Sequence, residues 1–143
     1  MCFSGDPNSL SVGNRLIDSE HQKISCMVKD IDQLILVKHF VALSAAIKKL
    51  IDYLPEYFLV EENIAKAVKF DFTKHRLAHQ ELLNNYRVIT DNIIIQDGKL
   101  SKLERKSYID SLNNILIEHI VFSSCSDGLY CSKYIYTAII FTP

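Results

Sequence analysis

The sequence predicts an all-α protein, an antiparallel four-helix bundle that runs up-down-up-down behind an N-terminal arm. Apolar residues recur at alternating intervals of three and four along four segments, at about residues 18–38, 41–66, 72–94 and 102–124. The breaks between these segments are short, which favours antiparallel neighbours. A chain of 143 residues has the length of one domain, so we expect a single domain over residues 1–143.

The first helix is expected at about residues 18–38, after an extended arm over residues 1–16. Its inward positions follow the helical period: Ile17, His21, Ile24, Val28, Ile31 and Ile35. Asp18 is a suitable N-cap, because its carboxylate can accept hydrogen bonds from the free N–H groups of the first turn.

The second helix is expected at about residues 41–66, and Pro55 inside it predicts a kink or a break. Its inward positions keep one register: Ile47, Leu50, Leu54, Tyr57, Glu61, Ile64 and Val68. His39 falls outside this register, so we expect it on the surface or in a loop.

The third helix is expected at about residues 72–94, and its inward positions are His75, His79, Leu82, Tyr86 and Ile89. Asp97 and Gly98 mark the turn that follows. Ser101 and Glu104 have the spacing of a capping box that opens the fourth helix. The inward positions of that helix are Leu112, Ile115, His119 and Phe122. Residues 125–143 are ambiguous, because the strand-like stretch 134–141 has no partner strand.

Composition limits the classes of function. The chain is 48% hydrophobic and 23% charged with a formal net charge of -1, which is typical of a globular protein without a nucleic-acid or membrane-surface partner. We find neither a signal peptide nor an apolar run of the roughly 18 residues that a bilayer span requires. We therefore expect a cytoplasmic monomer or small homo-oligomer. Its cysteines should be reduced: Cys2, Cys26, Cys125 and Cys131.

Five polar side chains interrupt the apolar stripes: His21, Glu61, His75, His79 and His119. Burying such groups without partners costs several kcal/mol, so something inside the bundle should neutralise them. His75 and His79 are four residues apart and share one helix face. Bundles build metal sites from facing helices in this way, and imidazole suits iron, zinc, copper and nickel. The pattern predicts a metal site, for which these two histidines, His119 and Glu61 already complete one set of ligands.

Four motifs, in this order and spacing, resemble those of the hemerythrin family, including its single-domain bacterial members. They are residues 10–14 followed by 17–21, residues 57–62 (against HFxxEE), residues 75–79 (HxxxH) and His119-Ile120 (the start of HIxxxD). The resemblance spans about residues 9–124. It implies a bundle that holds two irons through five histidines and two bridging carboxylates and binds dioxygen at the less-liganded iron. By this resemblance His75, His79 and His119 would hold one iron, His21 the other, and Glu61 would bridge them.

Two positions depart from the family pattern, since Tyr57 replaces the remaining histidine and Ser124 replaces the second bridging aspartate. Tyr57 has two interpretations. Its phenolate ligates iron, which favours ferric iron and works against reversible oxygen binding, or its ring fills space with the hydroxyl hydrogen-bonded. Asp127 resembles the aspartate of the family's DxxY, displaced by three residues, and needs a bulge or broken turn to reach the site. Cys125 is a thiolate ligand or a buried inert thiol.

Three functions remain open. The first is a hemerythrin-like non-haem iron protein that binds or senses dioxygen at a diiron centre. The second is a mononuclear iron or zinc site for storage, redox chemistry or structure, with His21 outside the set of ligands. The third is a metal-free bundle used for interaction, with residues 130–141 as a partner surface. No nucleophile–base pair or phosphate-binding loop indicates a substrate, so we assign no reaction and favour a protein that is not an enzyme.

Overall fold

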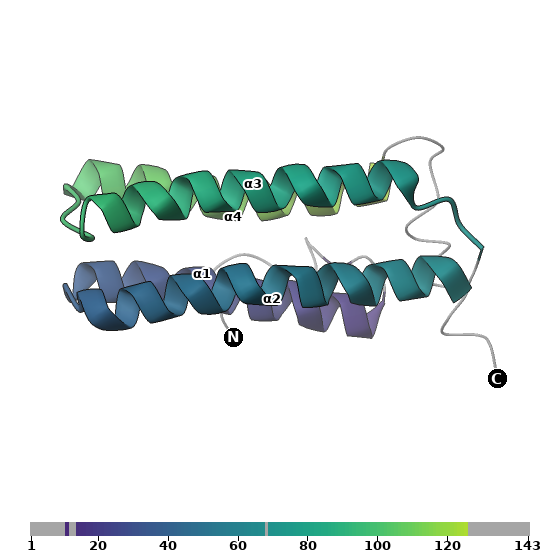
Figure 1. Cartoon of the computed structure of the whole chain (residues 1–143), viewed down its shortest axis with the longest axis horizontal. Coiled ribbons are helices and arrows are strands. Elements are labelled where there is room, and N and C mark those ends of the chain that lie inside the picture. Colours follow the sequence, from purple (N-terminus) through teal and green to yellow (C-terminus); the bar gives the residue numbers. More distant parts are fainter. Residues whose placement is uncertain (1–10, 12–13, 68, 126–143) are drawn as a thin grey trace.

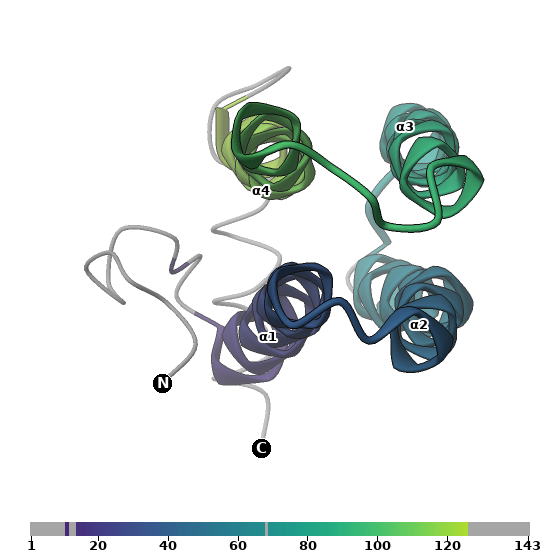
Figure 2. The ribbon, with the colours of Figure 1, turned by 90° about the vertical axis from the view of Figure 1, so that its left-hand side faces the viewer.

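The computed structural model describes residue 11 and residues 14–67 and 69–125, with side chains described as far as residue 120. This part of the chain forms four helices and no strand: α1 (Arg15–Leu36), α2 (Phe40–Ala67), α3 (Thr73–Ile95) and α4 (Lys102–Cys125). Consecutive helices run antiparallel along the long axis of the molecule (Figure 1). Viewed along that axis they stand at the corners of a square, and each packs on its two neighbours (Figure 2). The prediction of an all-α four-helix bundle is confirmed.

Helix α1 begins earlier than expected, and Asp18 is not its N-cap. The side chain of Asn14 caps the helix, because its Oδ1 accepts hydrogen bonds from the backbone N–H groups of Leu16 (2.9 Å) and Ile17 (3.2 Å). Asp18 lies in the first turn, where a carboxylate interacts favourably with the helix dipole, and it accepts a hydrogen bond from Ser11 Oγ at 2.7 Å. Most of the expected arm, residues 1–10 and 12–13, lies outside the described residues.

Helix α2 is not broken at Pro55, since it is assigned as one helix from Phe40 to Ala67. Pro55 lies on the exposed face, where water can satisfy the carbonyl group that loses its helical N–H partner. His39 is exposed in the turn before the helix, as expected, and its Nδ1 accepts a hydrogen bond from the N–H of Ala42 at 3.3 Å.

The predicted capping box at the start of α4 is confirmed by two reciprocal hydrogen bonds. The backbone N–H of Ser101 donates to Glu104 Oε2 (2.9 Å), and the N–H of Glu104 donates to Ser101 Oγ (3.2 Å). Farther along α4 the buried face differs slightly from the prediction, since Leu116 and Ile120 are buried and Ile115 is half-buried.

The apolar inner faces of the helices form a single core along the bundle axis. Its fully buried members come from all four helices, namely Ile24, Ile31, Leu50, Leu54, Tyr86, Ile93 and Leu112. The predicted core residues Val68 and Phe122 lie outside the part whose side chains are described. At one end of the bundle, the start of α1 and α3 and the end of α2 and α4, polar residues replace the apolar ones. This end carries the candidate site.

One cysteine contradicts the expectation of reduced thiols, because Cys26 on α1 forms a disulfide. Spacing in the sequence does not reveal such a pairing, since a disulfide depends on the distance between two cysteines in the fold. Cys2, Cys125 and Cys131 lie outside the residues whose side chains are described. None of the four described helices combines the length and the hydrophobicity that crossing a membrane would require.

Candidate metal centre

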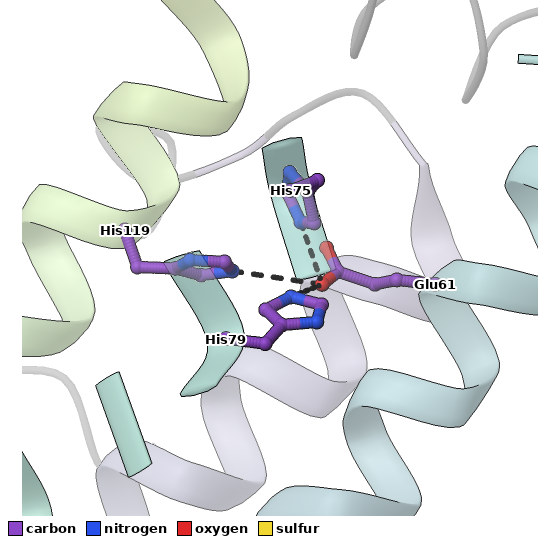
Figure 3. Close-up of side chains that lie close together, drawn as sticks. All are labelled: Glu61, His75, His79 and His119. Carbon is purple, nitrogen blue, oxygen red and sulfur yellow. Dashed lines mark hydrogen bonds and ion pairs between the residues drawn. The ribbon is translucent and has the colours of Figure 1, made fainter. Parts of the chain in front are cut away.

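Three helices bring four ligand-type side chains to one point inside the bundle. Glu61 comes from α2, His75 and His79 from α3, and His119 from α4, and the three imidazole rings point toward the carboxylate (Figure 3). One donor atom from each residue lies within 4.8 Å of all the others. Because His75 and His79 are one helical turn apart, both rings leave the same face of α3. The four residues therefore form a cluster of the size and composition of a metal site.

A single carboxylate oxygen is the centre of this cluster. Glu61 Oε2 lies 2.7 Å from His79 Nε2, 3.2 Å from His75 Nε2 and 3.5 Å from His119 Nε2. Glu61, His79 and His119 are buried, with at most 5% of each residue exposed, and His75 is half-buried. Protein groups rather than water therefore determine the electrostatics of the carboxylate.

Two phenylalanines hold imidazole rings of α3. The ring of Phe58 stacks on that of His79, with centroids 4.0 Å apart and planes 12° from parallel. Phe72, which directly precedes α3, packs against His75 with a centroid distance of 4.6 Å. These contacts restrict ring rotation and keep the Nε2 atoms directed at Glu61. The sequence argument did not identify either phenylalanine as part of the site, although Phe58 follows Tyr57 in the motif it singled out.

Opposing effects determine the pKa of the buried carboxylate. Burial raises the pKa of Glu61, but hydrogen bonds from His119, His75 and His79 together outweigh it and hold the pKa well below its usual range. Burial lowers the pKa of His79 to about 4, and the hydrogen bond and charge of Glu61 offset this only in part. At neutral pH Glu61 is therefore ionised and His79 is neutral. These are the protonation states in which both residues can bind a metal ion.

Tyr57 lies directly beside the cluster, one turn before Glu61 on α2. It is completely buried, and its hydroxyl oxygen lies 3.1 Å from His119 Nε2 and 3.0 Å from His21 Nε2. The hydroxyl thus connects a member of the cluster to His21 on α1. His21 is buried but does not belong to the group of four donors within 4.8 Å.

The donor set fits one metal ion. Imidazole nitrogen and carboxylate oxygen bind zinc at about 2.0–2.2 Å, so neighbouring donors around a tetrahedral ion are about 3.4 Å apart. The nitrogens of His75 and His119 lie 3.2 and 3.5 Å from Glu61 Oε2, close to that separation, and His79 Nε2 lies at a hydrogen-bond distance of 2.7 Å. Three imidazoles and one carboxylate suit iron or zinc. In the described part of the chain no other group of three or more histidine, cysteine, aspartate or glutamate side chains is as compact.

His119 is the member of the cluster that borders a cavity between α3 and α4. This cavity of about 250 Å³ has His119 in its wall, together with the side chains of Ala78, Leu82 and Ile115. Two carboxylates, Glu81 and Glu118, complete the wall with Asn85.

Of the site residues predicted from the sequence, four come together in the cluster: Glu61, His75, His79 and His119. Two more, His21 and Tyr57, lie next to the cluster in contact with each other. Asp127 lies outside the described residues, and Ser124 is in α4 beyond the last described side chain. Sequence reasoning missed one buried charge near this end, Glu20, whose carboxylate accepts hydrogen bonds from Lys23 and Tyr53.

Comparison of the chain with models of protein families, with curated proteins and with solved structures finds no match.

Proposed function

We propose that this protein is a metalloprotein that holds one transition-metal ion, iron or zinc, at Glu61, His75, His79 and His119. The observation that carries the proposal is the convergence of four donor atoms from three helices within 4.8 Å. Its chemistry is typical of a metal site, because the anionic carboxylate balances part of the charge of a cation and the imidazoles are nitrogen donors.

The hydrogen-bonding capacity of Glu61 favours a metal over a metal-free polar core. A carboxylate oxygen has two lone pairs, and hydrogen bonds to several N–H groups would normally be spread over both oxygens. Here three imidazole nitrogens approach one oxygen, Oε2, at 2.7, 3.2 and 3.5 Å. One oxygen has too few lone pairs for three such donors, whereas a cation lying between Oε2 and the three nitrogens would be bound by all four groups at once.

Iron is our first choice of metal because of the resemblance to hemerythrin. Bound iron would supply redox chemistry or dioxygen binding at this position. The residues of this chain orient and shield such a site: Phe58 and Phe72 hold the rings of His79 and His75, and the core excludes water from Glu61. The cavity beside His119 has room for a small molecule such as dioxygen.

A diiron, oxygen-binding centre is the second candidate. It is supported by the contact between His21 and Tyr57 on the side of His119, because the resemblance assigns a second iron to these two positions. Among the described side chains a second ion would find His21, the Tyr57 oxygen and a share of Glu61. Binding of this second ion would also require a further carboxylate ligand, such as that of Asp127.

Metal content per chain tests the proposal. The whole chain, expressed in iron-supplemented medium and purified gently, should contain one ion by elemental analysis. His75→Ala should retain much less metal, because one imidazole of the set is removed. His39→Asn is the matched control, since it removes an exposed histidine and keeps a side chain that can cap α2. Two irons would favour the diiron centre. A chain without metal, or a His75→Ala variant that keeps its metal fully, would overturn the proposed site.

A further inference from the structure

We infer that Tyr57 is a fifth ligand of the metal ion, bound through its phenolate oxygen, and that His21 holds this oxygen by a hydrogen bond rather than binding the ion itself. The inference rests on the proposed one-ion site. It assigns to that site an oxygen donor from an aromatic side chain and a supporting histidine.

The position of the hydroxyl carries the first part of the inference. Tyr57 lies one turn before Glu61, so both side chains leave the same face of α2. The Tyr57 oxygen is 3.1 Å from His119 Nε2, which is itself one of the four donor atoms around Glu61. Two donors at right angles around an ion, each bound at about 2.1 Å, are about 3.0 Å apart. The hydroxyl therefore lies at the separation expected of the ligand next to His119.

The surroundings of Tyr57 favour ligation over simple filling of space. Its ring is completely buried, and its hydroxyl is directed between two imidazole nitrogens, on His21 and His119. By contrast, Tyr86 is equally buried in the same bundle, and its hydroxyl donates to the backbone carbonyl of Leu112 at 2.8 Å. The Tyr86 hydroxyl satisfies a helix carbonyl, whereas the Tyr57 hydroxyl faces the candidate ligands.

His21 has the position of a supporting residue. Its Nε2 lies 3.0 Å from the Tyr57 oxygen, on the other side from His119, and it does not belong to the compact donor group. When the phenol ligates, its O–H bond breaks, an oxygen–metal bond forms and the proton passes to His21 Nε2. The N–H of His21 then donates a hydrogen bond to the phenolate. Partners of this kind orient ligands and adjust the properties of the metal.

Ligation by Tyr57 changes what the site can do. The set becomes three imidazoles, one carboxylate and one phenolate, with two anionic oxygens. Hard anionic oxygen donors stabilise ferric over ferrous iron. A site with this set is suited to redox chemistry or to holding ferric iron, and less suited to the reversible binding of dioxygen.

Spectroscopy of the ferric protein tests the inference. The metal-free whole chain is loaded with ferric iron alone, and iron per chain is measured beside the visible absorption and resonance Raman spectra. Wild type should show a visible tyrosinate-to-iron charge-transfer band with tyrosinate vibrations. Tyr57→Phe should keep its iron through the other four ligands and lose the band. Tyr86→Phe, the matched control, should keep both.

Each other outcome separates the two proposals. Bound iron without a tyrosinate signal in wild type, or with a signal that persists in Tyr57→Phe, would overturn the role of Tyr57 and leave the metal site standing. A wild-type chain that binds neither ferric iron nor, in a parallel loading, zinc would overturn both proposals. His21→Leu should keep its iron and shift the band, and a loss of iron would show that His21 is a ligand. Even if a variant fails to fold, the wild-type spectrum alone shows whether a tyrosine binds the iron.

Discussion

Acid should destabilise the metal-free chain through His79, in a pH range that the structure defines. Burial lowers the pKa of His79 from 6.5 to about 4 in the folded chain. Below the unfolded value of 6.5, the unfolded chain takes up a proton at His79 that the folded chain does not bind. Stability therefore falls as the pH drops from that value, and the loss from this residue is complete below about pH 4.

The size of this loss follows from the difference in pKa. A shift of about 2.5 units corresponds to about 3 kcal/mol in full, of which about 2 kcal/mol is lost between about pH 7.5 and about pH 5. Glu61 acts in a lower range. Its folded pKa lies well below 4.5, so its contribution to stability is full above 4.5 and is lost only as the pH falls further. The two residues therefore affect different parts of the pH profile.

Urea unfolding of the metal-free chain, followed by helical circular dichroism at these two pH values, measures the effect. His79→Gln keeps an N–H group that can donate to Glu61 but removes the titrating ring. The variant should lose about 2 kcal/mol less than wild type between the two pH values. His39→Asn should behave like wild type, because His39 is exposed. If wild type and His79→Gln lose the same free energy, the argument from burial of His79 is wrong.

Two further predictions concern the turn and the cap between α3 and α4, and both are measured as free energies of unfolding in urea. Ser101→Ala should cost about 1 kcal/mol, because it removes the acceptor for the N–H of Glu104, and Ser111→Ala inside α4 should cost little. An equal loss in the two variants would refute the role of the capping box. Gly98→Ala should cost about 1–2 kcal/mol, because the backbone there has a positive φ that disfavours a side chain. The added Cβ would also lie 2.8 Å from atoms of Leu43 and Phe40, so an unchanged stability would contradict the argument.

The register of each helix could be predicted from the sequence because burial of apolar side chains determines it. The alternation of threes and fours identified the faces of α1 and α2 on which Ile24, Leu50 and Leu54 are buried. Local signals were less certain where two residues compete for one role. Asn14 and Asp18 are both good caps, and the backbone geometry before α1 decides for Asn14. Pro55 predicted a kink or a break, and α2 continues through it as one helix packed against α1 and α3.

The cluster of Glu61 with three histidines was also predictable, since spacing within one helix and antiparallel packing bring these residues to one end of the bundle. Sequence alone did not decide between the two interpretations of the Tyr57 hydroxyl, ligation and simple filling of space. Whether Tyr57 ligates or fills space depends on where its ring directs the hydroxyl. That direction depends on the separation between α2 and its neighbours α1 and α3. The positions of Phe58 and Phe72 against the histidine rings depend on the same separations, which no spacing in the sequence encodes.

The length of the tyrosine side chain bears on how many ions the bundle holds. By the resemblance to hemerythrin, a histidine at position 57 would serve a second iron together with His21. The tyrosine oxygen instead lies 3.1 Å from His119 Nε2, which belongs to the first set of ligands, and 3.0 Å from His21. In the proposed one-ion site, Tyr57 would therefore face the donor group of that ion and keep His21 in contact with the phenol oxygen. Because Tyr57 would then bind the first ion and His21 would hold the phenol oxygen, neither residue would be left for a second ion, and we expect one ion in this bundle rather than two.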